Sequence, residues 1–166
     1  GDSESSWAGM AGSLKGGLHF GLSGFAFWSH DVPGFHSTPD FMNSVIDPKV
    51  YVRWTQFGVF TSHMRYHGSH KREPWYYPEV ADIVKKWWKL RYRLMPYIIE
   101  ESRHATESGW PVIQALLMHH PDDRTCWNIS DEYYFGRKML VAPVMSSDDK
   151  RDIYLPEGEW VNFFTG

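Results

Sequence analysis

The sequence predicts an α/β fold up to residue 108 and a mainly β region after it. Up to that point, short apolar runs alternate with longer segments whose apolar residues recur every three or four positions, as strands alternate with helices in α/β proteins. From residue 109 onward, short β-rich runs are separated by clusters of Pro, Gly, Ser and Asp, which favour turns. We therefore divide the chain into an α/β part, residues 1–108, and a β part, residues 109–166.

The first third of the chain is predicted to hold one helix, one strand and one loop. Apolar residues spaced by three or four predict a helix over residues 7–22, although each glycine within it lowers helix stability by about 1 kcal/mol relative to alanine. The aromatic run at 25–28 is typical of a buried parallel strand. Pro33 and Gly34 interrupt regular structure, and residues 36–47 are predicted to form a loop.

The middle of the chain is predicted to contain a second helix and a second strand. Asp47 is suited to cap a helix and Pro48 to occupy its first turn, so a helix is expected to begin there and to end at Gly58. Residues 59–62 follow as a short apolar run that is typical of a strand.

The clearest helix runs from Glu79 to about Ser108, where apolar residues keep a 3.6-residue period. Pro96 within it predicts a kink, because proline lacks the N–H that the helix needs. Gly109 is expected to end this helix. The β-rich runs that follow are residues 112–118, 138–145, 151–155 and 159–164.

The composition excludes several classes of protein. The chain has 17 Lys and Arg against 20 Asp and Glu, a formal net charge of −3, so it lacks the basic excess that binds nucleic acid. No apolar run reaches the roughly 18 residues that span a membrane, so no membrane partner is expected. The single cysteine, Cys126, excludes an internal disulfide and is interpreted as structural.

Polar residues that follow the predicted strands are the candidates for chemistry, because ligands of α/β folds bind beyond the carboxyl ends of the strands. Asp31 follows the run at 25–28, and His67 follows the run at 59–62. We expect Asp2 to follow a strand that lies outside the chain, so that all three residues face the same crevice.

Simpler interpretations of these residues stay open on spacing alone. Asp2, close to Ser and Glu, is also typical of a helix start. Asp31 before Pro-Gly and His67 before Gly are also typical of turns. His63, His67 and His70 have a spacing that fits a metal site only on a helix, which the strand prediction argues against, so no metal is predicted.

Distinctive motifs follow one another along nearly the whole chain. They are Gly1-Asp2, Gly16-Gly17-Leu18, Gly21-Leu22-Ser23-Gly24-Phe25, Phe27-Trp28-Ser29-His30-Asp31-Val32-Pro33-Gly34-Phe35, Arg65-Tyr66-His67-Gly68, Leu94-Met95-Pro96-Tyr97, Pro121-Asp122-Asp123, Val141-Ala142-Pro143-Val144 and Tyr154-Leu155-Pro156-Glu157-Gly158-Glu159-Trp160. In this order they resemble the motifs of glycoside hydrolase family 31.

The resemblance implies a fold and a reaction. Members of the family are retaining α-glycosidases built on a (β/α)8 TIM barrel with flanking β-sandwich domains. Residues 1–108 are then expected to be the C-terminal portion of the barrel, and residues 109–166 the beginning of an all-β sandwich. The start at Gly1 without Met agrees with this expectation that the chain is a fragment of a longer protein.

The resemblance also implies roles for individual residues. Asp2 matches the general acid/base of the family, and Asp31 and His67 match residues that bind the sugar. Trp28 and Phe27, on the run that leads to Asp31, are expected to form a wall of the sugar pocket.

Two further features bear on this pocket. Phe35 is a weaker candidate for its wall, and the loop at 36–47 is longer than usual for the family, which places an extra contact near the site. The resemblance implies no cofactor and no metal.

The reaction requires a group that the chain does not provide. A retaining mechanism needs two carboxyl groups about 5–5.5 Å apart, one as nucleophile and one as acid/base. The family carries its nucleophile in a Lys-x-Asp motif on an earlier strand, which has no counterpart before Asp2, and neither has the sugar-binding Arg that normally precedes the acid/base. The isolated chain is therefore expected to be inactive.

The sequence also favours one substrate class. The Phe-Trp-Ser-His-Asp form at residues 27–31 is closer to the α-xylosidase branch of the family than to the α-glucosidase branch. The predicted function is hydrolysis of terminal α-linked sugars, in first place α-xylosides, with an α-linked oligosaccharide or xyloside as the partner. An α-glucosidase or α-transglycosylase is the alternative within the family, and a non-catalytic sugar-binding module is the alternative of another class.

Overall fold

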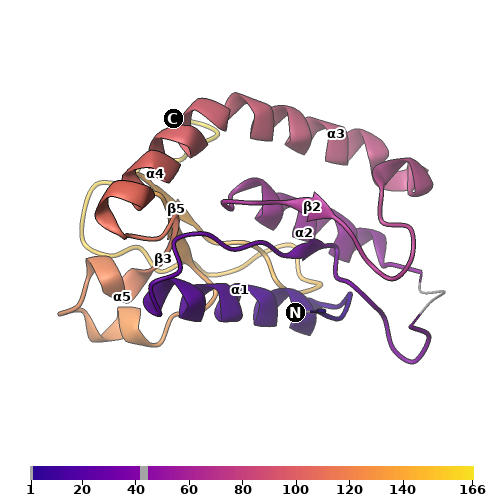
Figure 1. The fold of residues 1–166 in the computed structure, drawn as a ribbon, viewed down its shortest axis with the longest axis horizontal. Coiled ribbons are helices and arrows are strands. Elements are labelled where there is room, and N and C mark those ends of the chain that lie inside the picture. Colours follow the sequence, from indigo (N-terminus) through magenta and orange to yellow (C-terminus); the bar gives the residue numbers. More distant parts are fainter. Residues whose placement is uncertain (1, 42–44) are drawn as a thin grey trace.

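The computed structural model describes residues 2–41 and 45–166 of the chain. In the view of Figure 1, α3 (Pro78–Arg93) and α4 (Met95–Ser108) run along one side and α1 (Trp7–Leu22) runs along the opposite side. The strands lie between these two layers of helices, so each helical layer buries one face toward the middle of the molecule.

The first helix, α1, forms where the sequence predicts it. The side chain of Ser6 caps it by accepting a hydrogen bond from the backbone N–H of Gly9 at 3.1 Å. The residues of its buried face are Met10, Leu14, Gly17, Leu18 and Gly21. Two of these are glycines, which allows the neighbouring chain to approach the helix closely.

A short pair of parallel strands lies in the middle of the molecule. β1 (Asp31–Val32) pairs with β2 (Arg65–Tyr66), with Asp31 opposite Arg65. The carboxyl ends of the two strands therefore point the same way. A 3₁₀ turn, η1 (Pro74–Tyr76), precedes α3 on the way back from β2.

The strand predicted at 25–28 is wrong, although this run is adjacent to β1. The backbone N–H of Trp28 donates to Ser62 Oγ at 3.4 Å, and the Ser62 hydroxyl donates to the carbonyl of Trp28 at 2.9 Å. A side-chain hydroxyl thus satisfies backbone groups that a neighbouring strand would satisfy in a sheet. The burial expected from apolarity is also not found, because Phe25 and Phe27 are exposed and Ala26 and Trp28 are only partly buried.

The helix α2 (Pro48–Val59) begins as predicted and packs against α3. The Asp47 carboxylate caps its first turn. Gly58 does not end the helix, which continues one residue further, and the backbone N–H of Thr61 then closes a turn onto Gly58 O at 3.2 Å. These turn hydrogen bonds exclude the strand predicted at 59–62.

The long helix predicted after Glu79 is present as two helices, α3 and α4, which meet at Leu94. Pro96 lies in the first turn of α4, so the predicted kink is confirmed as a break immediately before it. Gly109 ends α4 in the left-handed conformation, with φ of 78°, as predicted.

The C-terminal part contains an antiparallel sheet in which β4 (Tyr133–Phe135) lies between β3 (Ile113–Ala115) and β5 (Met139–Val141). Two short helical segments connect β3 to β4. They are α5 (Leu116–His119) and the 3₁₀ turn η2 (Arg124–Trp127). β5 lies within the run predicted at 138–145, whereas β4 was not predicted, although its aromatic residues favour strands.

Other β-rich runs of the C-terminal part do not form the predicted strands. The run at 112–118 is a strand only in its first half, because α5 occupies the second half. Residues 151–155 and 159–164 are described and contain no strand. Tyr154 illustrates the reason, since its backbone N–H donates to the carboxylate of Glu132 at 3.0 Å rather than to a neighbouring strand.

One apolar core crosses the predicted boundary at residue 109. It joins residues of the first part such as Met10 and Trp54 to residues of the second part such as Ile113 and Phe135, each of which is fully buried. Packing therefore couples the two parts of the chain. Within the described residues, no helix is long and apolar enough to cross a membrane.

Candidate active site

The candidate site begins at the carboxyl ends of β1 and β2. Because the strands are parallel and Asp31 lies opposite Arg65, the two side chains meet, and Arg65 Nε donates to Asp31 Oδ1 at 2.7 Å. The Asp31 side chain is 8% exposed and the Arg65 side chain 60% exposed. The cation thus approaches a buried carboxylate from the solvent side.

His67 follows β2 directly and lies beside the chain that leaves β1. Its backbone N–H donates to Val32 O at 3.3 Å, which continues the register of the strands by one residue. The side chain of His67 is exposed, and its ring centroid lies 5.5 Å from that of Phe35. Asp31 therefore lies at the start of β1 and His67 directly after β2, and the backbone of His67 joins the chain one residue after Asp31.

The chain that follows Asp2 is hydrogen-bonded to the chain that follows Asp31. Phe35 N donates to Ser3 O at 2.7 Å, and Ser5 N donates to His36 O at 2.6 Å. We call residues 2–6 the Asp2 segment, residues 31–36 the Asp31 segment and residues 67–72 the His67 segment.

These three segments meet at one place although they are far apart in sequence. The Asp2 side chain itself is exposed to solvent. A cavity of about 360 Å³ opens along the His67 segment and is lined by residues 66–73. Of the predicted site residues, His67 lines this cavity, whereas Asp2 and Asp31 do not.

The structure places Trp28 against α1. A side chain at Gly17 would lie 2.2 Å from the Trp28 indole, so the ring rests on the bare backbone of the helix. Phe27 is 36% exposed and meets the edge of His63, with ring centroids 6.0 Å apart. Neither ring has a described contact with His67, whereas Phe35 has one.

His30 is a buried residue to which the sequence assigned no role. Trp54 Nε1 donates to His30 Nδ1 at 3.0 Å, and the His30 ring stacks on Phe57 with centroids 4.6 Å apart. An indole N–H can only donate, so Nδ1 accepts and the proton of the neutral ring is on Nε2. Burial, and to a smaller extent the charge of Arg91, lowers the pKa of His30 to about 3.

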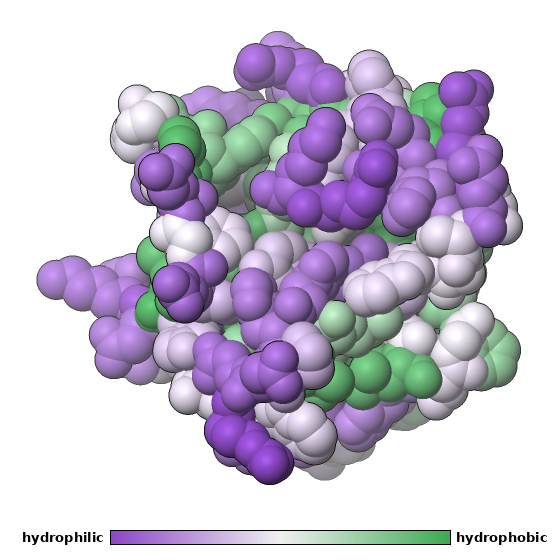
Figure 2. Space-filling view, turned by 90° about the vertical axis from the view of Figure 1, so that its left-hand side faces the viewer, coloured by the Kyte–Doolittle hydropathy of each residue, from purple (hydrophilic) through white to green (hydrophobic). Residues whose placement is uncertain are grey.

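A second cavity of about 1130 Å³ lies away from these segments. It is lined mainly by residues 138–144 and 159–164, together with Phe60 and Trp87. Figure 2 views the molecule from the left of Figure 1, and hydrophobic residues show there between hydrophilic ones. In the part of the chain that the structure describes, no group of three His, Cys, Asp or Glu residues could hold a metal ion.

Two family descriptions account for nearly the whole chain. The glycosyl hydrolases family 31 TIM-barrel domain matches residues 1–101, and the glycosyl hydrolase family 31 C-terminal domain matches residues 109–166. The chain belongs to glycosyl hydrolase family 31.

Individual relatives of this family 31 chain agree with the assignment. An α-xylosidase of Emericella nidulans is 38% identical over 99% of the chain and 21% of its own length. An α-glucosidase 2 of Bacillus thermoamyloliquefaciens is 37% identical over 100% of the chain and 21% of its own length. The chain thus spans about a fifth of the length of these relatives.

Solved structures of family 31 enzymes have the same fold over this length. A soil-metagenome α-xylosidase complexed with xylose matches with a TM-score of 0.85 and 31% identity, over 95% of this chain and 26% of that chain. A sulfoquinovosidase from E. rectale in complex with an aza-sugar inhibitor matches with a TM-score of 0.87 and 31% identity, over 100% of this chain and 26% of that chain. The resemblance found in the sequence motifs is therefore confirmed at the level of the family.

Proposed function

We propose that this family 31 chain contributes the general acid/base and part of the sugar-binding site of a retaining α-glycosidase that releases α-linked xylose. The observation that supports the proposal best is the hydrogen bonding of the Asp2, Asp31 and His67 segments to one another beyond β1 and β2. Barrel enzymes bind their substrates at this end of the strands. In this proposal, residues 1–108 are the C-terminal portion of a TIM barrel, and residues 109–166 begin a β-sandwich.

Asp2 is assigned the proton transfers. Its carboxyl group would first protonate the leaving oxygen of the glycoside and then, as a carboxylate, remove a proton from the water that hydrolyses the glycosyl-enzyme. The exposed side chain can reach a substrate. The backbone that carries it is fixed by two hydrogen bonds to the Asp31 segment, because Ser3 O accepts from Phe35 N and Ser5 N donates to His36 O.

Asp31 and His67 are assigned to the sugar whose bond is cleaved. Arg65 donates to one carboxylate oxygen of Asp31. In this proposal, the second oxygen accepts a hydrogen bond from a sugar hydroxyl. A neutral His67 ring can donate to one hydroxyl and accept from another. The ring of Phe35 beside His67 supports its place in the wall of the pocket.

Trp28 and Phe27 keep their predicted role in the pocket wall as part of this proposal. Their present neighbours are Gly17 and His63, so they would bound the pocket from the side of α1 and the chain before β2. Of the wall residues, Phe35 has the most direct support.

Xylose is the proposed sugar because the motif at residues 27–31 has the α-xylosidase form. The E. nidulans relative and the soil-metagenome structure, both named as α-xylosidases, agree with it. An α-glucosidase is the second candidate, supported by the 37% identity to the B. thermoamyloliquefaciens relative. In the full-length protein, a higher kcat/KM on an aryl α-xyloside than on the aryl α-glucoside supports the first candidate, and the reverse order the second. Sugar binding without turnover of either would identify a non-catalytic module.

The role of Asp2 is tested in the full-length protein with Asp2→Ala. This variant is expected to lower kcat/KM for a natural α-xyloside by about 10²–10⁴-fold, because the leaving oxygen is no longer protonated. An aryl α-xyloside with a good leaving group should lose much less at the glycosylation step, since its leaving group departs without a proton. Asp82→Ala, at an exposed carboxylate on α3, is the control and should change neither value. Equal losses on both substrates would contradict the acid/base role.

A further inference from the structure

A buried arginine joins the three segments of the proposed site. Arg72 is 1% exposed, and its guanidinium reaches out of the His67 segment into the other two. Nε donates to Gly34 O at 3.0 Å, and Nη2 donates to Phe35 O at 3.1 Å and to Ser5 Oγ at 3.4 Å. The side chain of Arg72, which belongs to the His67 segment, is therefore hydrogen-bonded to both the Asp31 segment and the Asp2 segment.

Two positions in the backbone around this guanidinium, Gly34 and Gly68, leave no space for a side chain. A Cβ on Gly68 would lie 2.7 Å from Arg72 Nε and 2.7 Å from Phe35 O. Gly34 has a φ of 98°, and a Cβ there would lie 2.5 Å from Ser5 Cα. The two glycines let the segments close around the arginine, so its position is defined by contact on several sides.

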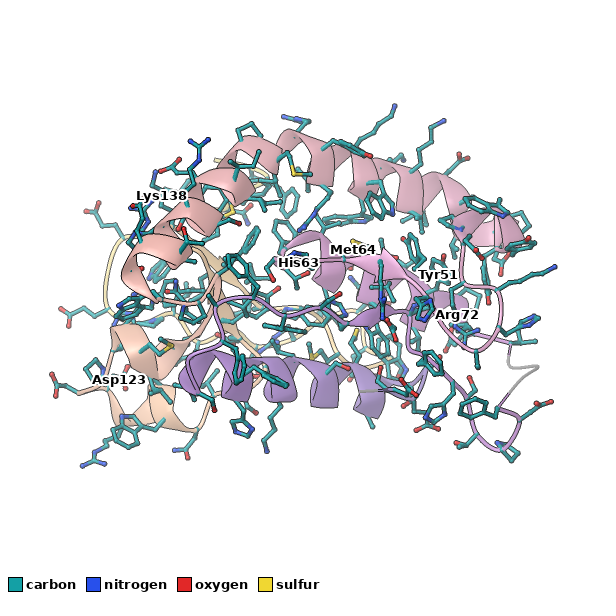
Figure 3. The ribbon with its side chains drawn as sticks, in the orientation of Figure 1. Tyr51, His63, Met64, Arg72, Asp123 and Lys138 are labelled. Atoms are coloured by element: carbon teal, nitrogen blue, oxygen red, sulfur yellow. The ribbon has the colours of Figure 1, made fainter. Side chains whose placement is uncertain are left out.

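The base of the arginine is fixed as well. The hydroxyl of Tyr51, from α2, donates to the carbonyl of Arg72, and the hydroxyl of Tyr77 donates to Lys71 O at 2.9 Å. Figure 3 shows Tyr51 and Arg72 next to each other beyond the end of β2. The guanidinium thus extends from an anchored backbone toward the Asp2 and Asp31 segments, which have little regular structure of their own.

We infer that Arg72 is a positioning residue, which sets the Asp2 segment relative to Asp31 and His67 without touching the substrate; this inference rests on the proposed function. The named acceptors are two carbonyls and a hydroxyl, and they lie around a planar fork whose donor directions are fixed. Such a group keeps the acid/base aligned with the residues that hold the sugar. A displacement of the acid/base by about 1 Å would lower the rate about 100-fold.

The inference is tested in the full-length protein with Arg72→Met, which keeps a long apolar stem and removes the fork. If the Asp2 segment loses its alignment, kcat/KM for the natural α-xyloside falls about tenfold further than kcat/KM for an aryl α-xyloside with a good leaving group, a weaker form of the Asp2→Ala pattern. Arg72→Lys keeps the charge but not the fork and should restore little of the loss. It also provides the same comparison if Arg72→Met does not fold.

Arg137→Met is the matched control. Arg137 Nη2 pairs with Glu101 Oε1 at 3.0 Å, and the Glu101 side chain is 1% exposed, so this variant also strands buried polar groups. Its neighbour in sequence, Lys138, lies at the opposite end of the molecule from Arg72 in Figure 3. A variant that only destabilises the protein lowers the fraction of active enzyme. It therefore lowers kcat/KM for both substrates by the same factor, which is the result expected for Arg137→Met.

A second measurement does not depend on activity. Hydrogen exchange of the backbone amides of Ser5 and Phe35 should accelerate at least tenfold in Arg72→Met and remain unchanged in Arg137→Met. If the wild-type protein turns over no glycoside, the proposed function fails, and the exchange result still decides whether Arg72 holds the segments. Equal losses on both substrates in an active enzyme, or unchanged exchange at these amides, would overturn the inference.

Discussion

At the scale of single residues, burial decides the chemistry of His30. Its ring packs against Trp28 and Phe57 and accepts a hydrogen bond from Trp54, which fixes the tautomer. Asp31, the next residue, is held from the solvent side by Arg65. A buried imidazole and a carboxylate paired with arginine are thus neighbours in the sequence, and each has a different set of partners.

The neutral state of His30 predicts an acid-sensitive stability. The pKa is lowered to about 3 in the folded protein from 6.5, so between these pH values the unfolded chain binds a proton that the folded chain does not. Stability therefore falls as pH drops through this window, by about 2 kcal/mol at pH 5, and is unaffected above it. His30→Gln, which keeps an acceptor for Trp54, should flatten the decline of the melting temperature between pH 7 and pH 5.

The control for this prediction is His104→Gln, at a partly exposed histidine on α4, which should leave the decline as it is in the wild type. His119, whose pKa is also lowered by burial, accounts for part of the remaining slope. A decline that is equally steep in His30→Gln would contradict the assignment to His30.

At the scale of elements, periodicity predicted the helices well and the strands poorly. Helix periodicity is local, so α1, α2 and the pair α3–α4 appear close to their predicted bounds. A strand also needs a neighbouring strand as a hydrogen-bonding partner. In the run at 25–28, the Ser62 hydroxyl bonds the carbonyl of Trp28 instead. The same limit applies to the proposed site. The motifs predicted Asp31 and His67, whereas the contacts of Arg72 depend on which segments meet and could not be predicted from them.

The glycines of α1 predict opposite effects of the same substitution. At Gly17 an added methyl group would lie 2.2 Å from the Trp28 indole, whereas at Gly12 nothing lies within 4 Å. Gly17→Ala is therefore expected to lower the free energy of unfolding by about 1–3 kcal/mol through overpacking. Gly12→Ala is expected to raise it by up to about 1 kcal/mol through helix propensity. Urea denaturation of the two variants measures both values, and a stabilising Gly17→Ala would contradict the packing of Trp28 on α1.

At the scale of the whole molecule, the two family 31 parts of the chain share one interior. Met10 and Trp54 belong to the same core as Ile113 and Phe135. Polar contacts reinforce it, since the Tyr97 hydroxyl of α4 donates to Phe135 O at 2.7 Å. The second part is thus packed onto the helical layer and not attached to it by a linker.

The isolated chain is expected to show no glycosidase activity, because it presents one candidate catalytic carboxylate where the mechanism requires two. The purified 166-residue chain, incubated with an aryl α-xyloside, should release no aryl alcohol above the uncatalysed rate. The full-length protein under the same conditions is the positive control. Turnover by the isolated chain with a covalent glycosyl-enzyme detectable by mass spectrometry would contradict this expectation.

The pairing of α4 with the β4–β5 turn also limits how such enzymes can exchange parts. Arg137 and Glu101 form a salt bridge across residue 109, and Gly136 leaves room for the Glu101 side chain, 2.4 Å from where its own Cβ would lie. A chimera that joins two family members at residue 109 would combine one parent's helix with the other parent's turn and separate these partners. A crossover at Leu94, where the helix is already interrupted, would keep α4 and the turn from the same parent, so this salt bridge would be preserved.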